Sequence, residues 1–364
     1  MQGRPMLVTG RASYYLARKI WDNLGKHPGM QQVKLHEPEV TTFANENLKV
    51  KITESVRGAD VFVVQTAANA WHAPRGVNPD KCSQEEASRL TLHENLMELL
   101  ITIDALSDAS AGRITVVCPY YPYVRSDKKD EPRISITARL MAQLLKEAGA
   151  DRVLTVNLHA LQIQGFVPMP CDQLDANNLI AEYFKAKYDT DNIGALATDA
   201  GGVKITTVYA EKLQVPLAVC DKRRWDDSED PEIRNVIGIE QIQNKEIAIF
   251  DDEILTGNTM TRAIHALREQ FGLSVSYVSC VHPVLRGEAL EKIFDAGIRR
   301  LITTDTLPPP KANDRIHVVS TAPLLAAAIK NIHTNQSVTQ IFKKQRYLLK
   351  PETEDGSNTP AMDG

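Results

Sequence analysis

The stretch that decides the fold runs from Ile247 to Met260 and reads IAIFDDEILTGNTM. Its apolar beginning predicts a buried strand, and Asp251 and Asp252 follow at the carboxyl end, where open α/β sheets bind their ligands. A loop and a helical pattern over residues 261–271 come next, and a helix N-terminus attracts anions. This order predicts a site for a phosphorylated sugar, with the acids on ribose hydroxyls and the loop on the 5′-phosphate. A turn that merely caps an ordinary helix is the alternative. The loop residues are Thr256, Gly257, Asn258 and Thr259.

Composition limits the classes of protein to which the chain can belong. Its 364 residues suffice for two domains, and a formal net charge of −4 argues against a general nucleic-acid binder. No apolar run approaches the roughly 18 residues of a membrane span, and no signal peptide opens the sequence, so we expect a cytoplasmic protein. The five cysteines are widely spaced without a C-x-x-C pair, which indicates neither a disulfide framework nor a zinc site.

Apolar strands alternate with helical patterns along most of the chain, which predicts two α/β domains, each with a mainly parallel sheet flanked by helices. Further candidates follow two of these strands. His159 comes after the strand 152–156, although a hydrogen-bonded structural imidazole is the alternative there. Asp199-Ala200-Gly201-Gly202 comes after the strand 194–198, and its paired glycines allow a tight turn and a close approach to an anion.

Polar segments between these elements are harder to interpret. Residues 122–130, PYVRSDKKD, combine aromatic and basic side chains that could contact a nucleotide, although a solvated charged loop is the alternative. Residues 225–234 are acidic and contain proline, which is typical of a mobile lid. Residues 71–92 predict a long excursion from the fold. Residues 43–47 and 54–58 read as polar loops, and residues 343–364 predict a disordered tail.

Taken together, eight segments resemble the ribose-phosphate pyrophosphokinase family, also called phosphoribosyl pyrophosphate synthetases, from about Leu7 to Phe342. They are ESVRGAD (54–60), NLMELL (95–100), PYVRSDKKD (122–130), NLHALQIQGF (157–166), DAGGVK (199–204), DKRR (221–224), DDEILTGNT (251–259) and HPVL (282–285) with Gly287. The resemblance implies two type I phosphoribosyltransferase-like domains. Residues 1–175, completed by 334–342, would form the ATP side, and residues 176–333 the ribose 5-phosphate side.

The family transfers the pyrophosphoryl group of ATP to O1 of ribose 5-phosphate, which gives phosphoribosyl pyrophosphate and AMP for nucleotide biosynthesis. The resemblance implies Mg²⁺ as the cofactor, held by His159 and Asp199 directly or through water. It implies Lys222 and Arg224 as lid cations that act in catalysis with His159. The ribose 5-phosphate residues would be Asp251, Asp252, Thr256, Gly257, Asn258 and Thr259, with Asp199, Ala200, Gly201 and Gly202 as the pyrophosphate loop. The ATP residues would be Phe43, Asn45, Arg125 and Asp130.

The resemblance also implies a homo-oligomer built from dimers, possibly a hexamer, with ATP and ribose 5-phosphate as ligands and neither nucleic acid nor membrane as a partner. ADP or phosphate would bind between subunits. Leu161 takes a position that a small hydroxyl residue usually holds, so we expect a weak response to phosphate. Ser55, Arg57, Gln164, Ser337 and Thr339 occupy the positions of this regulatory site.

Several residues depart from the family pattern. Leu255 replaces an acid before the Thr-Gly of the sugar loop, and Asn157 replaces an aspartate before His159; Asn258, Ser126 and Asn47 differ as well. These changes support an alternative, a catalytically silent member that assembles with and regulates an active synthetase. A phosphoribosyltransferase would share DDEILTGNT but should lack the two-domain length. Because Lys222, Arg224 and the acids remain, we expect an active enzyme.

Overall fold

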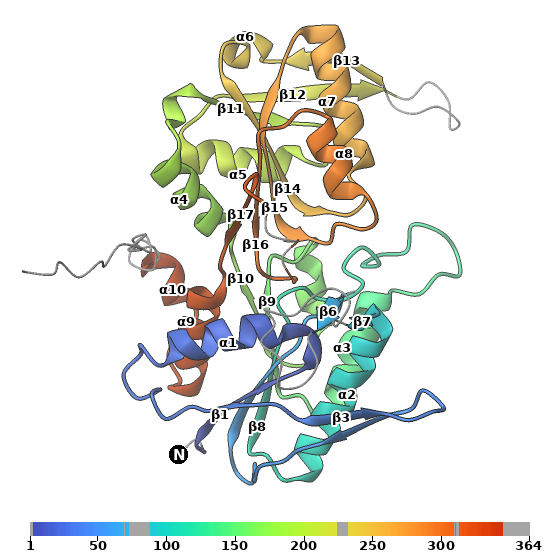
Figure 1. Ribbon diagram of the computed structural model, residues 1–364, viewed down its shortest axis with the longest axis vertical. Coiled ribbons are helices and arrows are strands. Elements are labelled where there is room, and N and C mark those ends of the chain that lie inside the picture. The colour runs from blue at the N-terminus through green and yellow to red at the C-terminus, as the bar shows by residue number, and fades with distance from the viewer. Residues whose placement is uncertain are drawn as a thin grey trace, which may run out of the picture.

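The computed structural model describes residues 3–68, 70–72, 88–223, 232–308, 310 and 313–344. Two large sheets, each covered by helices on both faces, lie one beyond the other along the molecule, with the first sheet at the bottom of Figure 1 and the second at the top. Nearly all strand pairs in these sheets are parallel. The expected fold class is therefore confirmed.

The first sheet has the strand order β10-β9-β8-β5-β1-β2 and is parallel throughout. Its central strands are apolar runs, as strands buried on both faces require. Helices α1 and α9 lie side by side on one face, and α2 and α3 cover the other (Figure 1). The strands are β1 (Pro5–Thr9), β2 (Leu35–His36), β5 (Asp60–Val64), β8 (Arg113–Val117), β9 (Arg152–Val156) and β10 (Cys171–Leu174); the helices are α1 (Tyr14–Leu24), α2 (Leu92–Asp108), α3 (Thr137–Glu147) and α9 (Ala322–His333).

The second sheet has the order β13-β12-β11-β14-β15-β16-β17, and only the pair β12–β13 is antiparallel among its described strands. Helices α4 and α5 cover one face, and α7 and α8 the other (Figure 1). The strands are β11 (Ile193–Ala197), β12 (Leu217–Arg223), β13 (Glu232–Ile237), β14 (Glu246–Ile254), β15 (Val275–Pro283), β16 (Arg300–Thr304) and β17 (Ile316–Val319); the helices are α4 (Asn177–Lys187), α5 (Val203–Leu213), α6 (Ile239–Ile242), α7 (Asn258–Phe271) and α8 (Ala289–Asp295).

The position of β14 gives this sheet the strand order of a ligand-binding α/β sheet. From β11 the chain proceeds outward through β12 and β13, and it then returns to place β14 on the other side of β11. Connections that leave two neighbouring strands in opposite directions open a crevice at the carboxyl ends of those strands. The loops after β11 and β14, both anion-loop candidates, therefore flank the same crevice.

Smaller elements complete the chain. Strands β3 (Glu39–Thr42) and β4 (Leu48–Lys51) form a hairpin that projects from the first domain at the lower right of Figure 1. Strands β6 (Ala70–His72) and β7 (Ser88–Leu90) pair antiparallel. The remaining elements are the 3₁₀ turns η1 (Arg11–Ser13), η3 (Leu161–Phe166) and η4 (Thr190–Asn192), and α10 (Thr339–Lys344).

The structure adds detail to the sequence expectation and differs from it in one segment. Residues 43–47, expected as a polar loop, form the turn that closes the β3–β4 hairpin. Strand β10, Cys171–Leu174, comes before α4 and is too short and polar to be predicted from the sequence alone. Glu232–Arg234, expected in the lid, begin β13, where antiparallel pairing with β12 supplies the backbone hydrogen bonds. All of the remaining lid, most of the excursion 71–92 and nearly all of the tail lie outside the described residues.

Helix α9 returns from the second sheet to the first. It was included in the expected domain 176–333, yet it packs on α1. At its end, His333 Nδ1 lies 2.7 Å from Asp60 Oδ2, and Arg113 donates to the Ile332 carbonyl at 3.1 Å. The two domains thus share this part of the chain, and the domain boundaries stay predictions.

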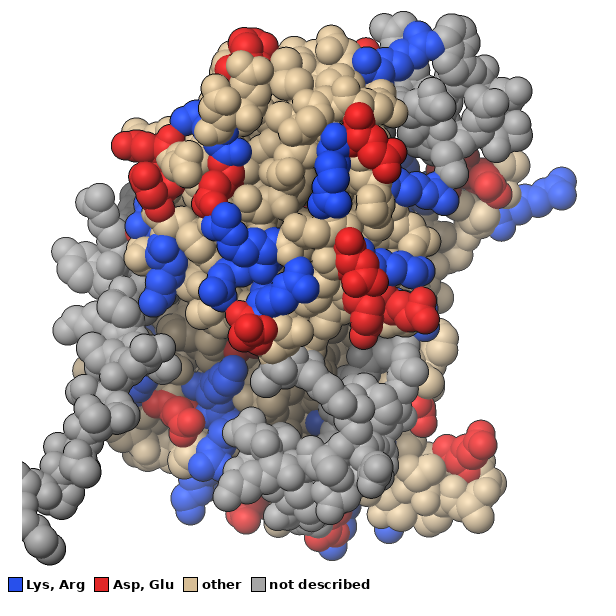
Figure 2. Space-filling view, turned by 45° about the horizontal axis from the view of Figure 1, so that its top comes forward, with Lys and Arg blue, Asp and Glu red and all other residues tan. Residues whose placement is uncertain are grey.

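The surface of the second domain carries both signs of charge. Figure 2 shows Lys and Arg side chains gathered on the middle of one face, with Asp and Glu side chains around and between them. Such a mixed face produces no broad field of one sign. Within the described ranges, no helix is long and apolar enough to cross a membrane.

Candidate active site

Three neighbouring strands of the second sheet end against the first domain. Asp252 of β14 contacts Nδ1 of His159, His282 of β15 bonds to the Asn157 carbonyl, and Asp305, directly after β16, pairs with Lys19. Since β14, β15 and β16 are adjacent, these contacts form a row along one edge of the sheet. The row brings His159, at the end of β9, to the acids that open the sugar loop.

The two adjacent acids of β14 have opposite electrostatic states. Burial, helped by the hydrogen bond with Asp252, raises the pKa of Asp251 to about 8. Burial acts on Asp252 in the same sense, but hydrogen bonds with His159 and Asp251 outweigh it and hold the pKa of Asp252 below its usual range. The same contact with Asp252 raises the pKa of His159. The site therefore holds one carboxylate paired with an imidazole beside a carboxyl that retains its proton at neutral pH.

Asn157, which stands where the family pattern has an acid, is held through both its backbone and its side chain. The buried imidazole of His282 donates from Nε2 to the Asn157 carbonyl at 3.0 Å, so Nδ1, 2.9 Å away, accepts from the Thr306 hydroxyl. Burial lowers the pKa of His282, which favours this neutral form. The Asn157 side chain accepts from the Ala176 N–H at 2.7 Å. Asn157 is thus held at both ends, in a structural role that fixes the strand end carrying His159.

Glu253 is a site residue that the sequence interpretation missed. It is buried, accepts from the Tyr120 hydroxyl at 3.0 Å and pairs with Nε of Arg125. Arg125 belongs to the 122–130 loop, so this loop is tied to the sugar strand and is not merely a solvated one. A third consecutive acid at the end of an apolar strand was the available signal, since such a charge needs a partner.

The start of helix α7 is open. Gly257, its N-cap, has φ 71°, and no side chain caps the helix in the described part of the chain. A Cβ on Gly257 would lie 3.0 Å from Cγ1 of Ile293, so the loop needs glycine for both conformation and space. The backbone N–H groups that follow have no helical acceptor and can bind an anion. Thr256, Asn258 and Thr259 border this N-terminus, and Lys292 lies 3.4 Å from the Asn258 carbonyl oxygen Oδ1.

The second anion-loop candidate lies across the crevice. Asp199 follows β11 and accepts from the Gly202 N–H at 2.9 Å, which folds Ala200 and Gly201 into a turn before α5. The negative charge of Asp199 contributes to the raised pKa of Asp251, as expected for acids on neighbouring strands. The structure thus brings the predicted pyrophosphate loop and the predicted sugar loop to one place.

The predicted ATP residues are not all together. Arg125 lies at the domain boundary, while Asp130 is exposed at the end of the same loop. Phe43, 49% exposed, and Asn45 lie at the tip of the β3–β4 hairpin, which points away from the strand ends in Figure 1. One chain therefore does not bring these residues to His159.

Of the two predicted lid cations, Lys222 and Arg224, only Lys222 lies in a described element. Lys222 lies in β12 at a point where the register with β13 shifts, and such bulges often occur beside active sites. Arg224 lies outside the described residues. Their catalytic roles stay predictions.

The predicted regulatory residues lie at both ends of the first sheet. Ser55 and Arg57 precede β5, whereas Gln164 follows β9, so a parallel sheet separates them. Ser337 and Thr339 follow α9, and the Asn331 side chain donates to the Ser337 carbonyl at 3.0 Å. A single chain does not unite the set.

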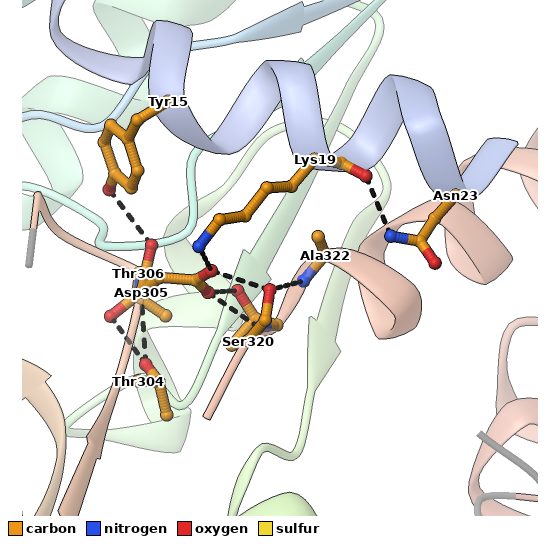
Figure 3. Close-up of polar contacts among 9 residues, drawn as sticks. Tyr15, Lys19, Asn23, Thr304, Asp305, Thr306, Ser320 and Ala322 are labelled. Atoms are coloured by element: carbon orange, nitrogen blue, oxygen red, sulfur yellow. Dashed lines mark hydrogen bonds and ion pairs between the residues drawn. The ribbon is translucent and has the colours of Figure 1, made fainter. Parts of the chain in front are cut away.

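Asp305 directly follows β16, and Asp252 lies near the end of β14, but the surroundings of the two acids differ. Its side chain is fully buried and accepts from Ser320 at 2.7 Å and from the N–H and hydroxyl of Thr321 at 2.7 and 2.8 Å. Lys19 of α1 lies 3.1 Å away, and the Tyr15 hydroxyl donates to the Asp305 carbonyl (Figure 3). Both oxygens of this carboxylate already accept hydrogen bonds from the protein, next to the start of α9, so none is left for a ligand.

Comparison with known proteins places this geometry in a family. Residues 5–149 match the N-terminal domain of ribose phosphate pyrophosphokinase, and residues 172–296 match the phosphoribosyl transferase domain. The chain belongs to the ribose-phosphate pyrophosphokinase family. A ribose-phosphate pyrophosphokinase of Caldanaerobacter subterraneus is 39% identical over 92% of this chain and 97% of its own length. One of Deinococcus radiodurans is 39% identical over 93% and 98%, respectively.

A solved structure agrees. The phosphoribosylpyrophosphate synthetase of Mycobacterium smegmatis superimposes with a TM-score of 0.76 at 35% identity, covering 91% of this chain and 99% of that one. The expected family, and with it the expectation of an enzyme, is confirmed. None of these comparisons favours a silent regulatory member.

Proposed function

We propose that the chain transfers the pyrophosphoryl group of ATP to O1 of ribose 5-phosphate and releases AMP. The observation that carries the proposal is the contact of Asp252 with His159, because it joins the sugar strand of one domain to a strand end of the other. Two substrates bound at these ends would meet at the contact. In a displacement without a covalent intermediate, an enzyme accelerates the reaction mainly by holding both reactants in one geometry and by stabilising the developing charge.

Ribose 5-phosphate fits the β14–α7 segment. The open start of α7 would bind the 5′-phosphate through N–H groups, and Thr256 and Thr259 would add hydroxyl donors. Asp251 and Asp252 would accept from ribose hydroxyls. The Leu255 side chain has no hydrogen-bond acceptor, so Asp251 and Asp252 would be the only acids that accept from the ribose hydroxyls in this segment. The Asp199–Gly202 turn would then face the pyrophosphate group from across the crevice.

The residues present fit Mg²⁺ as the cofactor. Mg²⁺ usually takes one or two protein ligands together with phosphate oxygens and water. In the described residues, no group of three or more His, Cys, Asp or Glu side chains forms a ready-made cage. His159 and Asp199 would instead add ligands, directly or through water, to an ion carried by ATP. The bound ion would supply positive charge at the transferring group.

The remaining nucleotide contacts would come from Arg125, Asp130, Phe43 and Asn45. Because the β3–β4 hairpin points away from the strand ends, a second copy of the chain would have to supply Phe43 and Asn45. This requirement supports a homo-oligomer. Lys222 and Arg224 would close over the phosphates and meet charge that develops in the transition state.

The test is AMP release from ATP and Mg²⁺ with and without ribose 5-phosphate, with phosphoribosyl pyrophosphate measured as the second product. Lys222→Ala is the matched variant, expected to lower kcat about 100-fold with smaller changes in either KM. A folded wild-type protein that forms no AMP at saturating substrates would favour the silent member.

Regulation by phosphate or ADP would also need neighbouring subunits, because one chain does not unite Ser55, Arg57 and Gln164. Leu161 is 53% exposed beside Gln164 and offers no hydrogen bond to phosphate. Weak phosphate activation, with ADP acting mainly against ATP, stays our prediction. Initial rates over a phosphate series, and ADP inhibition at low and saturating ATP, measure it.

A further inference from the structure

Glu253 carries a buried charge that the proposed roles of Asp251 and Asp252 do not use. Its side chain is about 1% exposed, and both of its oxygens meet the first domain. The Tyr120 hydroxyl donates to Oε2 at 3.0 Å, and Nε of Arg125 contacts Oε1. A buried carboxylate is stable only when it is paired and hydrogen-bonded. Glu253, Tyr120 and Arg125 therefore form one unit across the domain boundary.

Arg125 is held at one end of its guanidinium only. Its side chain is 56% exposed, although its partner is buried. A guanidinium has five N–H donors in a rigid fork, and a contact through Nε leaves both terminal amino groups available. Within the described ranges, no second carboxylate pairs with Arg125. The free amino groups thus offer a bidentate contact to another anion.

Tyr120 makes this support rigid. Its ring is buried and meets the His282 ring edge-on, with 5.1 Å between centroids. His282 is fixed in turn by its bond to the Asn157 carbonyl. The hydroxyl that holds Glu253 therefore cannot move far, and Glu253 holds Arg125 in one direction.

We infer that Glu253 positions Arg125 for the nucleotide: it aims the free amino groups at phosphate oxygens of ATP and links the ATP-side loop to the strand that carries the sugar acids. This inference rests on the proposed function, in which Arg125 contacts ATP. Glu253 touches neither substrate. Loss of its charge lowers the affinity for the nucleotide and leaves the affinity for the sugar unchanged.

Glu253→Gln tests the inference because it keeps the shape and removes the charge. The KM for ATP should rise about tenfold, while kcat and the KM for ribose 5-phosphate stay within about twofold. The matched control is Glu246→Gln at the start of the same strand. Glu246 accepts from the Tyr277 hydroxyl at 2.6 Å and pairs with Arg299. This group also consists of a glutamate, a tyrosine and an arginine, but it lies far from the carboxyl ends of the strands, where the site is. Glu246→Gln should leave all three constants unchanged.

A double-mutant cycle with Arg125→Ala separates positioning from a general effect on the fold. In the Arg125→Ala background, Glu253→Gln should change the KM for ATP less than twofold, because no guanidinium is left to aim. If Glu253→Gln does not fold, Glu253→Asp replaces it with the same expectation, since it keeps the charge but withdraws it by one methylene.

Direct titration with a non-hydrolysable ATP analogue gives the same comparison without turnover. An inactive wild type would remove the proposed function, and the titration would still decide the role of Glu253. An equal rise in both KM values, or a tenfold effect that persists without Arg125, overturns the inference.

Discussion

Strands β14 and β16 lie two places apart in one sheet, and each presents an aspartate near a helix N-terminus. Asp305, directly after β16, accepts from the N–H of Thr321, the residue before α9, and from the hydroxyls of Ser320 and Thr321, and it is fully buried. After β14, the start of α7 is left without a side-chain cap in the described residues, and Asp252 contacts His159 and accepts from the Glu253 N–H but keeps 25% of its side chain exposed. An acid at a strand end is therefore a binding residue only where the protein leaves its acceptors and the neighbouring N–H groups available.

Asp252→Asn should produce the largest effect. It removes the charged acceptor for ribose hydroxyls and the partner of His159, so kcat/KM for ribose 5-phosphate should fall about 100-fold, or roughly 2.7 kcal/mol. The KM for ATP should change little. Titration of each substrate separately measures this, and an effect confined to ATP is incompatible with the assigned role.

Asp305→Asn should show the reverse pattern. The amide places a donor among groups that donate to the carboxylate, so the free energy of unfolding should fall by roughly 2 kcal/mol. Urea unfolding without ligand measures the loss. Activity per folded molecule should stay within about twofold of wild type. A loss of activity like that of Asp252→Asn, without loss of stability, would mean that Asp305 also belongs to the binding site.

Gly257→Ala tests whether the open helix start depends on glycine. The positive φ and the contact with Ile293 should together cost about 1.5 kcal/mol and raise the KM for ribose 5-phosphate. Gly272→Ala at the other end of α7 is the control, because φ is 66° but no atom lies within 4 Å of its Cβ position. The control should cost less stability and leave the KM unchanged. Equal effects at both glycines would exclude the Ile293 contact as the cause.

The last prediction concerns pH. The pKa of Asp251 is raised to about 8, so its contribution to stability is complete below the ordinary value of the unfolded chain and is lost as pH rises through 8. Relative to Asp251→Asn, wild type should lose stability from pH 5 to pH 9, by less than the roughly 1.4 kcal/mol per pH unit that one group can supply. Parallel pH profiles of the two proteins would mean that Asp251 is ionised in the free enzyme.

The sequence by itself determined the two α/β domains and the principal strand-end sites. Apolar runs fix buried strands, and chain order fixes which loops follow them, so Asp251, His159 and the Asp199 turn could be located without coordinates. The eight motifs indicated the family because their order along the chain is a property of the sequence and does not depend on how the chain packs. Local sequence does not set contacts between distant segments, so the pairing of Asp252 with His159 was not predicted.

Tertiary structure alone decided which acids are available. Asp252, Glu253 and Asp305 look equivalent in sequence, each near the end of an apolar strand. Packing of the first domain against the strand ends pairs Glu253 with Arg125, encloses Asp305 and leaves the start of α7 open. The physical reason is that a carboxylate's role depends on burial and on donors contributed by residues far away in the chain, and only folding brings those donors within hydrogen-bond distance.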